Sequence, residues 1–233
     1  MTPSLDPPVN LSAIHILRRV PLFSGLAESD LAAFAALVRE RRYPKGAVIV
    51  FRDDPGDALY VVADGQVKVV LVAEDGREVI LSVLRDGDFF GEMSVLDDEP
   101  RSAHVIAMED SRLLALRRED FQAQLRSSPG VGVALLRELS RRLRRADEQI
   151  GRLVLLDVNG RVASLLLTMA AEEGGDKITR RLTHHTIAQM IGASRETVSR
   201  TLRNLVEHNV IEVSRKEILL RDRATLGQAA RRV

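Results

Sequence analysis

The chain has 233 residues, of which 45% are hydrophobic, and a formal net charge of +1. This length allows one large domain or two modest ones with an ordinary core. The absence of cysteine excludes disulfides, zinc–cysteine sites and cysteine-ligated iron–sulfur clusters. No apolar run approaches the roughly 20 residues that a membrane helix needs, and the first ten residues lack the hydrophobic core of a signal peptide. We therefore expect a cytoplasmic protein with no membrane partner.

The N-terminal part reads as a flexible tail followed by short helices. Residues 1–10 are polar and proline-rich. Residues 11–20 and 28–41 are expected to form amphipathic helices, the second with Ser29 or a neighbour as its cap. Its apolar residues recur at helical spacing, at Leu31, Phe34, Leu37 and Val38. Between the two helices, Pro21–Phe23 is expected to plug the core of the next domain.

Between Tyr43 and Leu116 the sequence predicts an all-β domain. Glycines recur at about ten-residue intervals, and short β-branched runs lie between them, at 48–50, 59–62, 67–72 and 79–83. Strands of this length and spacing are typical of a sandwich or barrel. Glu74–Arg77 is a plausible hairpin turn, because Asp-Gly tolerates positive φ. The interpretation is a β-roll, whose mouth is a common place for a small ligand.

A set of polar residues near the end of this domain predicts a small-ligand site. Gly91 and Glu92 are followed by a short apolar run, an acidic turn with a proline, and Arg101-Ser102-Ala103. Arginine forks onto phosphate oxygens and keeps its charge, and a serine with backbone N–H groups can complete an anion-binding concavity. Glu92 can accept from a sugar hydroxyl. A surface Arg–Glu pair at a β-turn is the simpler alternative.

A long helix is predicted from Pro129 to Leu156. Its apolar residues alternate at spacings of three and four, which is the a/d seam of a two-stranded coiled coil: Leu136, Leu139, Leu143, Ala146, Ile150 and Leu153. The flanking positions are heavily charged. We expect a homodimer joined through residues 129–156, and packing of the stripe on the β-domain of the same chain is the alternative.

The C-terminal part is mildly basic, with 13 Lys and Arg against 9 Asp and Glu from Asp157 onward. That balance fits a phosphate-backbone partner without requiring one. Asp157–Gly160 is expected to be a hinge. The next helix is expected to start near Gly160 and to carry Val162, Leu165, Leu166 and Met169, and Glu172–Lys177 is expected to be a loop.

Residues 182–205 show a helix-turn-helix pattern. A first helix begins at Leu182–Thr183 and holds Ile187, Ala188 and Ile191, and Gly192-Ala193-Ser194 makes a tight turn. A second helix from Arg195 would lie in the major groove with its N-terminal turns towards the base edges. Arg195, Glu196 and Arg200 are predicted base readers, because arginine pairs with guanine and glutamate accepts from cytosine. Thr183, Ser194 and Thr197 are predicted to hold phosphates. A surface Arg/Glu cluster on a helical hairpin is the alternative.

Two further features adjoin this motif. His184-His185 suggests a metal, but adjacent helical residues point apart and no further ligands are near in sequence, so no metal site is predicted. Val210–Val213 and Ile218–Leu220 predict a β-wing, with Arg215 and Lys216 at its tip and Lys216 towards DNA phosphate. The tail at 224–233 is assigned no role.

The stretch from Phe89 to Val105 resembles the phosphate-binding cassette of the cyclic-AMP receptor protein (catabolite activator) family, within the superfamily that includes the fumarate-nitrate regulators. The string SRETVSR at 194–200 closely resembles that family's recognition helix. The resemblance extends from about Pro21 to about Leu220. It implies that Arg101 and Ser102 hold a cyclic phosphate, that Glu92 takes the ribose 2′-hydroxyl and that Gly91 admits the backbone, with Met93 and Ala103 as further cassette residues. It also implies a TGTGA-like half-site.

One departure from the family concerns the nucleotide base. In the family's best-known member a Thr-Ser pair on the dimer helix contacts the adenine from both subunits, and the matching positions here are Ala146 and Asp147. Ala146 offers no hydroxyl, whereas Asp147 can accept a hydrogen bond from an exocyclic amine and is retained as a ligand-binding candidate. Cyclic AMP is the expected ligand, and a ligand-independent regulator on the same scaffold stays open.

The sequence thus predicts an α+β protein. Its parts are a tail and short helix (1–20), a cyclic-nucleotide-binding β-roll (21–128), a dimerisation helix (129–156), a hinge (157–160) and a winged helix-turn-helix domain (161–233). The expected function is a homodimeric transcription regulator, controlled by cyclic AMP, that reads a DNA palindrome and contacts RNA polymerase.

Readings from other classes are weaker. No nucleophile–base set, metal triad or nucleotide-hydrolysing loop supports an enzyme, and none is predicted. A nucleotide sensor that acts only through protein partners would have no reason to place Arg195, Glu196 and Arg200 on one face. A haem-based gas sensor on the same scaffold would need axial ligands.

Overall fold

The computed structural model describes residues 11–180, 182–214 and 217–231. The chain divides into two compact units, Met1–Arg77 with Leu81–Arg142 and Glu78–Ile80 with Leu143–Val233. Within the described residues, none of the helices is both long enough and apolar enough to cross a membrane. The expected α+β class is confirmed, with a β-domain first and a helix-turn-helix last.

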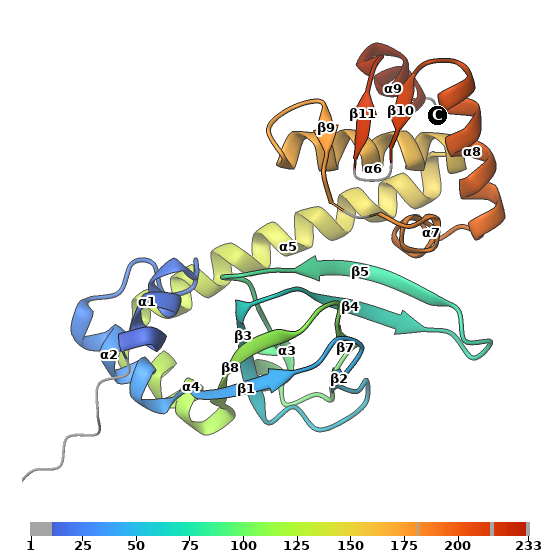
Figure 1. Cartoon of the computed structure of the whole chain (residues 1–233). Helices are drawn as coiled ribbons and strands as arrows, with labels where there is room; N and C mark the ends of the chain where they lie inside the picture. The colour runs from blue at the N-terminus through green and yellow to red at the C-terminus, as the bar shows by residue number, and fades with distance from the viewer. Residues whose placement is uncertain (1–10, 181, 215–216, 232–233) are drawn as a thin grey trace, which may run out of the picture. The chain divides into compact units, whose positions relative to one another are not determined.

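The described part of the first unit is built on two four-stranded sheets (Figure 1). Their strand orders are β1-β8-β3-β6 and β2-β7-β4-β5. The pairs β1–β8, β8–β3, β3–β6, β2–β7 and β7–β4 are antiparallel. The strands are β1 (Arg39–Tyr43), β2 (Val48–Val50), β3 (Ala58–Asp64), β4 (Val67–Val72), β5 (Glu78–Leu84), β6 (Phe89–Phe90), β7 (His104–Ala107) and β8 (Ser111–Arg117). The four predicted strand runs are therefore confirmed as β2 to β5.

Apolar side chains from both sheets meet in the core of the roll. Side chains that point between the sheets are buried, among them Val62, Val67, Phe90 and Leu113. Phe90 also stacks on Tyr60, with ring centroids 5.1 Å apart. These contacts fix β6 and the chain that leaves it, which is where the ligand cassette begins.

The helix expected over 28–41 is too long. Helix α2 (Glu28–Leu37) ends at Leu37, because Val38 is already extended and Arg39–Tyr43 pairs with β8 instead. Its N-cap is Ala27, without a side-chain cap bond, so the expected cap at Ser29 is wrong. Pairing with a strand some seventy residues away overrides the local helical pattern.

Helices α1 (Leu11–Arg19), α2 and α4 (Arg118–Ser127) gather at one end of the roll (Figure 1). Their apolar faces and the first part of α5 (Pro129–Leu155) share one core with β3 and β8. Leu22 and Phe23 are each 1% exposed in this core, and Phe23 contacts Phe34 at 4.7 Å between ring centroids. The connector between α1 and α2 thus packs as the expected plug.

Helix α5 carries two apolar faces rather than one. Val131 and Leu135 are buried in the first unit's core, and Leu139 packs against it. The other face is exposed, with Leu136, Leu143 and Ile150 at 66%, 63% and 59%. The seam as predicted is therefore partly wrong: Leu139 belongs to the core of its own chain. The exposed stripe has the same spacing of three and four and consists of Val133, Leu136, Ser140, Leu143, Asp147, Ile150 and Val154.

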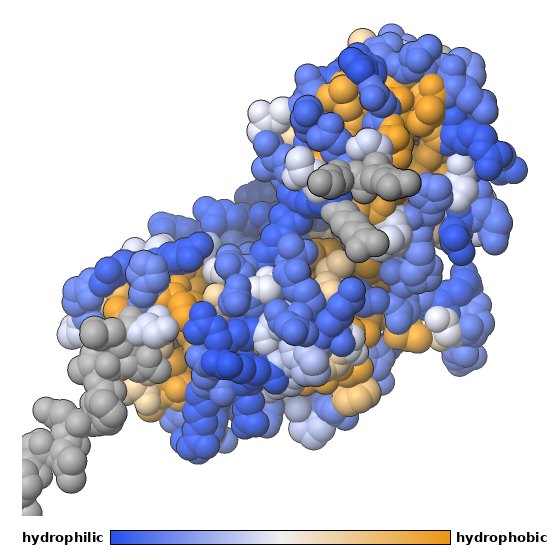
Figure 2. Space-filling model, in the orientation of Figure 1, coloured by the Kyte–Doolittle hydropathy of each residue, from blue (hydrophilic) through white to orange (hydrophobic). Residues whose placement is uncertain are grey.

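The described part of the second unit is a helical domain with a small sheet. It contains α6 (Val158–Glu172), β9 (Lys177–Ile178), α7 (His184–Ile191), α8 (Arg195–Glu207), β10 (Ile211–Val213), β11 (Ile218–Leu220) and α9 (Arg223–Ala229). The sheet order is β10-β11-β9. Val162, Leu166, Ile187 and Val198 meet in one buried core. Apolar residues also reach the surface around the wing strands of this unit, within a mostly hydrophilic exterior (Figure 2).

The expected hinge and tail both differ from the structure. The cap of α6 is Asp157, whose Oδ1 accepts from Gly160 N at 2.8 Å, so three of the four expected hinge residues lie inside the helix. The tail, to which no role was assigned, forms α9 and buries Leu226 completely. Gly160 lies against Ala229 O, because a Cβ there would approach that oxygen to 2.8 Å. The first ten residues lie outside the described ranges.

Candidate ligand and DNA sites

Arg101 is the buried centre of the cassette, which we define as residues 91–103. Its side chain is 4% exposed, and its Nη1 and Nη2 donate to Gly91 O at 3.0 Å and to Ala58 O at 2.7 Å. Burial lowers the pKa of Arg101 from its usual value, against the opposing influence of Tyr60 and the nearby carboxylates. The guanidinium nevertheless stays charged, as arginine does throughout the working pH range.

The backbone around Arg101 is held from both sides. Gly91 has φ of +84°, which favours glycine, and a Cβ there would collide with the Arg101 guanidinium and lie 2.9 Å from Ala58 O. Arg101 N donates to Asp54 O at 2.9 Å, and Arg101 O accepts from Asp53 N at 2.9 Å. The arginine is therefore locked to the loop before β3 by main-chain bonds as well as by its own side chain.

Glu92 opens helix α3 (Glu92–Asp97), which contains the short apolar run of the cassette. It is 4% exposed and pairs with Arg142 of α5, with 3.0 Å between Nη1 and Oε1. Arg142 Nη2 also donates to Phe89 O at 2.7 Å, and its guanidinium lies 4.4 Å from the Phe89 ring centroid. The alternative of a surface Arg–Glu pair is therefore wrong, since Arg101 and Glu92 are both buried and make their direct contacts to different partners.

A second arginine, Arg118 at the start of α4, secures the far side of α3. Its Nε donates to Gly56 O at 2.9 Å and its Nη2 to Ser94 O at 2.8 Å, while Nη1 pairs with Asp98. Gly56 allows this approach, since a Cβ there would overlap the Ser94 side chain. Arg118 thus holds together the loop before β3 and the helix that carries Glu92.

The remaining cassette residues differ in accessibility. Ser102 is exposed, with its Oγ 4.0 Å from Met93 Sδ, and Met93 is itself 50% exposed. Ala103 is buried at the start of β7. Asp147 is exposed on α5 and lies on the stripe with Leu143 and Ile150. The predicted seam contained its neighbour Ala146 instead.

The charges of the cassette fit an anionic ligand with a hydroxyl. The carboxylate of Asp57 is 3.6 Å from Arg101 Nη2 but is 85% exposed, so the buried Arg101 charge has no buried counterion among the described residues. Arg101 Nε and Glu92 Oε2 are buried and, in the described part of the chain, lack hydrogen-bond partners. Each such group costs about 1–3 kcal/mol when it stays unpaired. A phosphate would pair with the Arg101 charge and accept from its Nε. A ligand hydroxyl would donate to Glu92 Oε2.

In the second unit, α7 and α8 form the predicted helix-turn-helix. Thr183 caps α7 by accepting from Thr186 N at 3.0 Å, and Ser194 caps α8 by accepting from Thr197 N at 3.2 Å. Gly192 closes α7 with φ of +62°. Arg195, Glu196 and Arg200 are all exposed on α8, while Val198 and Leu202 are buried beneath it. Arg215 and Lys216, the predicted tip of the wing, lie outside the described residues.

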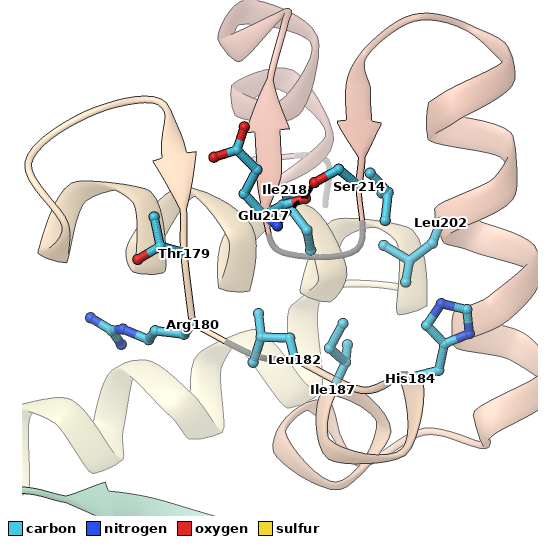
Figure 3. A pocket seen from close by; sticks show the side chains of 10 residues that line it. Thr179, Arg180, Leu182, His184, Ile187, Leu202, Ser214, Glu217 and Ile218 are labelled. Carbon is cyan, nitrogen blue, oxygen red and sulfur yellow. Dashed lines mark hydrogen bonds between the residues drawn. The ribbon is translucent and has the colours of Figure 1, made fainter.

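A cavity of about 430 Å³ lies between the wing, the chain before α7 and helix α8 (Figure 3). Leu182, Ile187, Leu202 and Ile218 form its apolar part, and His184 stands on its wall. Glu217 and Arg180 line it too, but their charged ends are directed away from its centre (Figure 3).

Comparison with known proteins agrees with both halves of this description. The family model of the Cyclic nucleotide-binding domain matches residues 40–128, and that of the Crp-like helix-turn-helix domain matches residues 160–229. The Cyclic AMP receptor protein of Thermus thermophilus is 40% identical over 210 residues, which are 90% of this chain and 96% of that protein. The chain belongs to the cyclic AMP receptor protein (CRP/FNR) family.

Other members of the CRP family are similar over nearly the whole chain. The CRP-like cAMP-activated global transcriptional regulator of Mycobacterium tuberculosis is 35% identical over 222 residues, 93% of this chain and 99% of that protein. The solved structure of the c-di-GMP responsive global regulator CLP of Xanthomonas campestris has a TM-score of 0.74 at 25% identity and covers 83% of this chain and 99% of that one. The chain is accordingly a DNA-binding transcription regulator with a cyclic-nucleotide domain.

Three residues of this CRP-family site were missed by reasoning from the sequence. In the sequence, Arg142 is one of the charged flanking positions of the predicted long helix, and no motif includes Arg118 or Asp57. A usable indication existed for Arg142, because Val131, Leu135 and Arg142 share one helical face opposite the exposed stripe. Arg118 has no comparable indication, since its partners come from two distant loops.

Proposed function

We propose that this CRP-family chain is a homodimeric transcription regulator whose β-roll binds cyclic AMP and whose winged helix-turn-helix reads a TGTGA-like palindrome. The observation that carries the ligand half is the buried Arg101, whose charge has no buried counterion in the described structure. A buried charge is costly unless it is paired. The cyclic phosphate is an anion of the right size and charge for that position, with Ser102 as a further donor.

The sugar and base have candidate partners on two elements. Glu92 Oε2 is the acceptor for the ribose 2′-hydroxyl, since Oε1 is already paired with Arg142. Asp147 is the acceptor for the exocyclic amine of adenine, which Ala146 cannot contact through a hydroxyl. Asp147 lies on the exposed stripe of α5, so in a dimer through that stripe it would stand at the subunit boundary.

Coupling between ligand and DNA would run through α5. Arg142 joins this helix to Glu92, so a ligand that engages Glu92 acts on an element that continues to the start of α6. Ligand would favour the dimer arrangement in which the two recognition helices lie about one DNA turn apart. Contact with RNA polymerase is the further partner that a regulator of this kind implies.

A second candidate is the same regulator under a different ligand or under none. The replacement of the base-contact hydroxyls by Ala146 and Asp147 favours it. A further support is that a structural relative in Xanthomonas campestris is described as responsive to c-di-GMP. This candidate keeps the DNA-binding half of the proposal and changes only the effector.

Fluorescence anisotropy of a labelled TGTGA palindrome, at fixed salt, tests the proposal with and without cyclic AMP. We expect a cyclic-AMP-dependent gain in affinity for the unmodified protein. In Arg101→Ala the loss of charge-assisted bonds of about 1.5–3 kcal/mol each should weaken cyclic AMP binding by about 10- to 100-fold or more. Arg112→Ala is the matched control, because Arg112 is partly exposed in the same domain and pairs with Glu40.

Three outcomes would count against parts of the proposal. If the affinity for the palindrome is the same with and without cyclic AMP but changes with c-di-GMP, the result supports the second candidate instead. Unchanged cyclic AMP binding in Arg101→Ala would remove the cassette from the ligand site. No preference for the palindrome over a scrambled duplex in any condition would refute the predicted DNA sequence.

A further inference from the structure

The histidine pair at the start of α7 has a structural role that the proposed function does not use. His184 and His185 are both exposed. Within the described ranges there is no group of three His, Cys, Asp or Glu side chains suited to a metal ion. His184 instead contacts α8: its Nδ1 and Ser199 Oγ lie 2.7 Å apart.

This contact places the imidazole beside the DNA-reading surface. Ser199 lies one turn after Arg195 and directly before Arg200 on α8, the helix expected in the major groove. His184 is the first residue of α7, directly after the capping Thr183. In a helix-turn-helix the first helix crosses the DNA backbone, and helix N-termini favour phosphate. His184 is thus held between a helix start and the base-reading face.

Charged and titratable groups near His184 lie on α7 and α8. On α8 the charged neighbours of Ser199 are Arg195, Glu196 and Arg200. His185 is the other titratable group on the first turn of α7.

Across the cavity, the charged groups are already paired. Glu217 faces away from His184 and pairs with Lys177 at 3.4 Å (Figure 3). Arg180 points away too and pairs with Glu172 at 2.7 Å and Glu173 at 3.0 Å. The charged ends of Glu217 and Arg180 are therefore not directed at the imidazole.

We propose that His184 is a DNA-phosphate contact and that it takes up a proton when the complex forms. In the protonated ring both nitrogens donate: Nδ1–H to Ser199 Oγ and Nε2–H to a phosphate oxygen. One proton passes from solution to each subunit, and no other bond changes. The inference rests on the DNA-binding half of the proposed function and is independent of the effector.

The sign of the pH effect follows from linkage. An imidazole is half protonated near pH 6.5 in the absence of other charges. If the complex binds more protons than the free partners, DNA affinity rises as pH falls through this region. If protonation strengthens DNA binding about tenfold per subunit, the imidazole binds its proton about tenfold more tightly in the complex than in the free protein.

The experiment measures DNA affinity by anisotropy between pH 8 and pH 6 at constant ionic strength, on the TGTGA palindrome and on a scrambled duplex. We expect the unmodified protein to bind up to about tenfold more tightly per subunit at pH 6, on both duplexes, because phosphate contacts are independent of sequence. His184→Gln should bind weakly with most of this pH dependence lost. His184→Arg, which is charged at every pH tested, should bind tightly and also with little pH dependence.

His185→Gln is the matched control and should keep the full pH dependence, and Ser199→Ala should lose part of it because the ring is no longer held. Thermal unfolding at each pH checks that every variant is folded. The inference is overturned if the unmodified protein shows no pH dependence, if His184→Gln keeps it, or if His185→Gln abolishes it. Binding to neither duplex at any pH, with or without cyclic AMP, would instead refute the proposed function.

Discussion

At the scale of single residues, Arg142 connects the ligand cassette to the long helix. It pairs with Glu92 at 3.0 Å, donates to Phe89 O and lies over the Phe89 ring. Its side chain is 27% exposed, whereas that of Glu92 is 5% exposed. Removing the arginine would therefore leave a buried carboxylate without its cation, which is more costly than the loss of a surface ion pair.

We predict that Arg142→Met destabilises the protein by about 1–3 kcal/mol, less than the full value for a completely buried pair because Arg142 is partly exposed. In Arg142→Met/Glu92→Gln much of this loss should return, since no unpaired charge remains. Urea unfolding of both single variants and the double variant measures the coupling. Additive losses in the double variant would contradict the interpretation. Arg141→Met, on the exposed surface, is the control.

The sequence predicted which side chains suit a phosphate and a sugar, but it did not predict which residues those side chains contact. The cassette residues from Gly91 to Ser102 are predicted ligand contacts because their types suit a phosphate and a sugar, and the structure brings them together. Arg142 lies fifty positions from Glu92, and nothing local pairs the two. Their binding roles stay predictions until nucleotide affinity is measured.

At the scale of elements, α5 is organised by two stripes on one helix. The face with Val131 and Leu135 packs on the first unit, and the face with Leu136, Leu143 and Ile150 is exposed. An exposed row of large apolar side chains at alternating spacings of three and four is typical of a helix that pairs with a second copy. We therefore retain the dimer as a proposal and move its seam to the exposed stripe.

We predict that Leu143→Asp converts the protein to monomers, because each subunit would lose an apolar side chain near the middle of the seam and add a second carboxylate close to Asp147. Sedimentation velocity across a concentration series measures this outcome. Arg144→Asp, exposed but off the stripe, should remain dimeric. Leu139→Ala should lower the free energy of unfolding without changing the assembly state, as Leu139 packs within its own chain. A dimeric Leu143→Asp variant would exclude the proposed seam.

At the scale of the whole molecule, we propose that cyclic AMP binding and DNA binding are allosterically coupled. Thermodynamic linkage makes such coupling reciprocal. If cyclic AMP strengthens DNA binding by some factor, DNA must strengthen cyclic AMP binding by the same factor. The contact from Glu92 to Arg142 is the described link between the cassette and α5 that such coupling would use.

We predict that the affinity for cyclic AMP, measured by calorimetry, rises in the presence of a saturating palindrome by the factor found for DNA in the reciprocal titration. Couplings of this kind usually amount to about 5- to 150-fold. In Arg142→Met both factors should fall together, because the variant acts on the link between the two sites. Unequal factors in the unmodified protein would show that the two titrations do not report one coupled equilibrium.

The sequence by itself determined the features that depend on near neighbours in the chain. The two helices of the helix-turn-helix, the tight turn at Gly192 and the β-branched strand at 67–72 follow from interactions within a few residues, so the pattern reveals them. The cassette and the recognition helix belong to this group as well, because each is a contiguous set of side chains.

Only the tertiary structure decided which distant segments meet. Arg39–Tyr43 is a strand because β8 supplies its hydrogen bonds, and Leu139 leaves the seam because the core of the first unit covers it. Glu92 gains its cation from α5, and His184 meets Ser199 across the turn between two helices. Such contacts are set by packing among elements far apart in the chain, and the local periodicity of the sequence does not predict them.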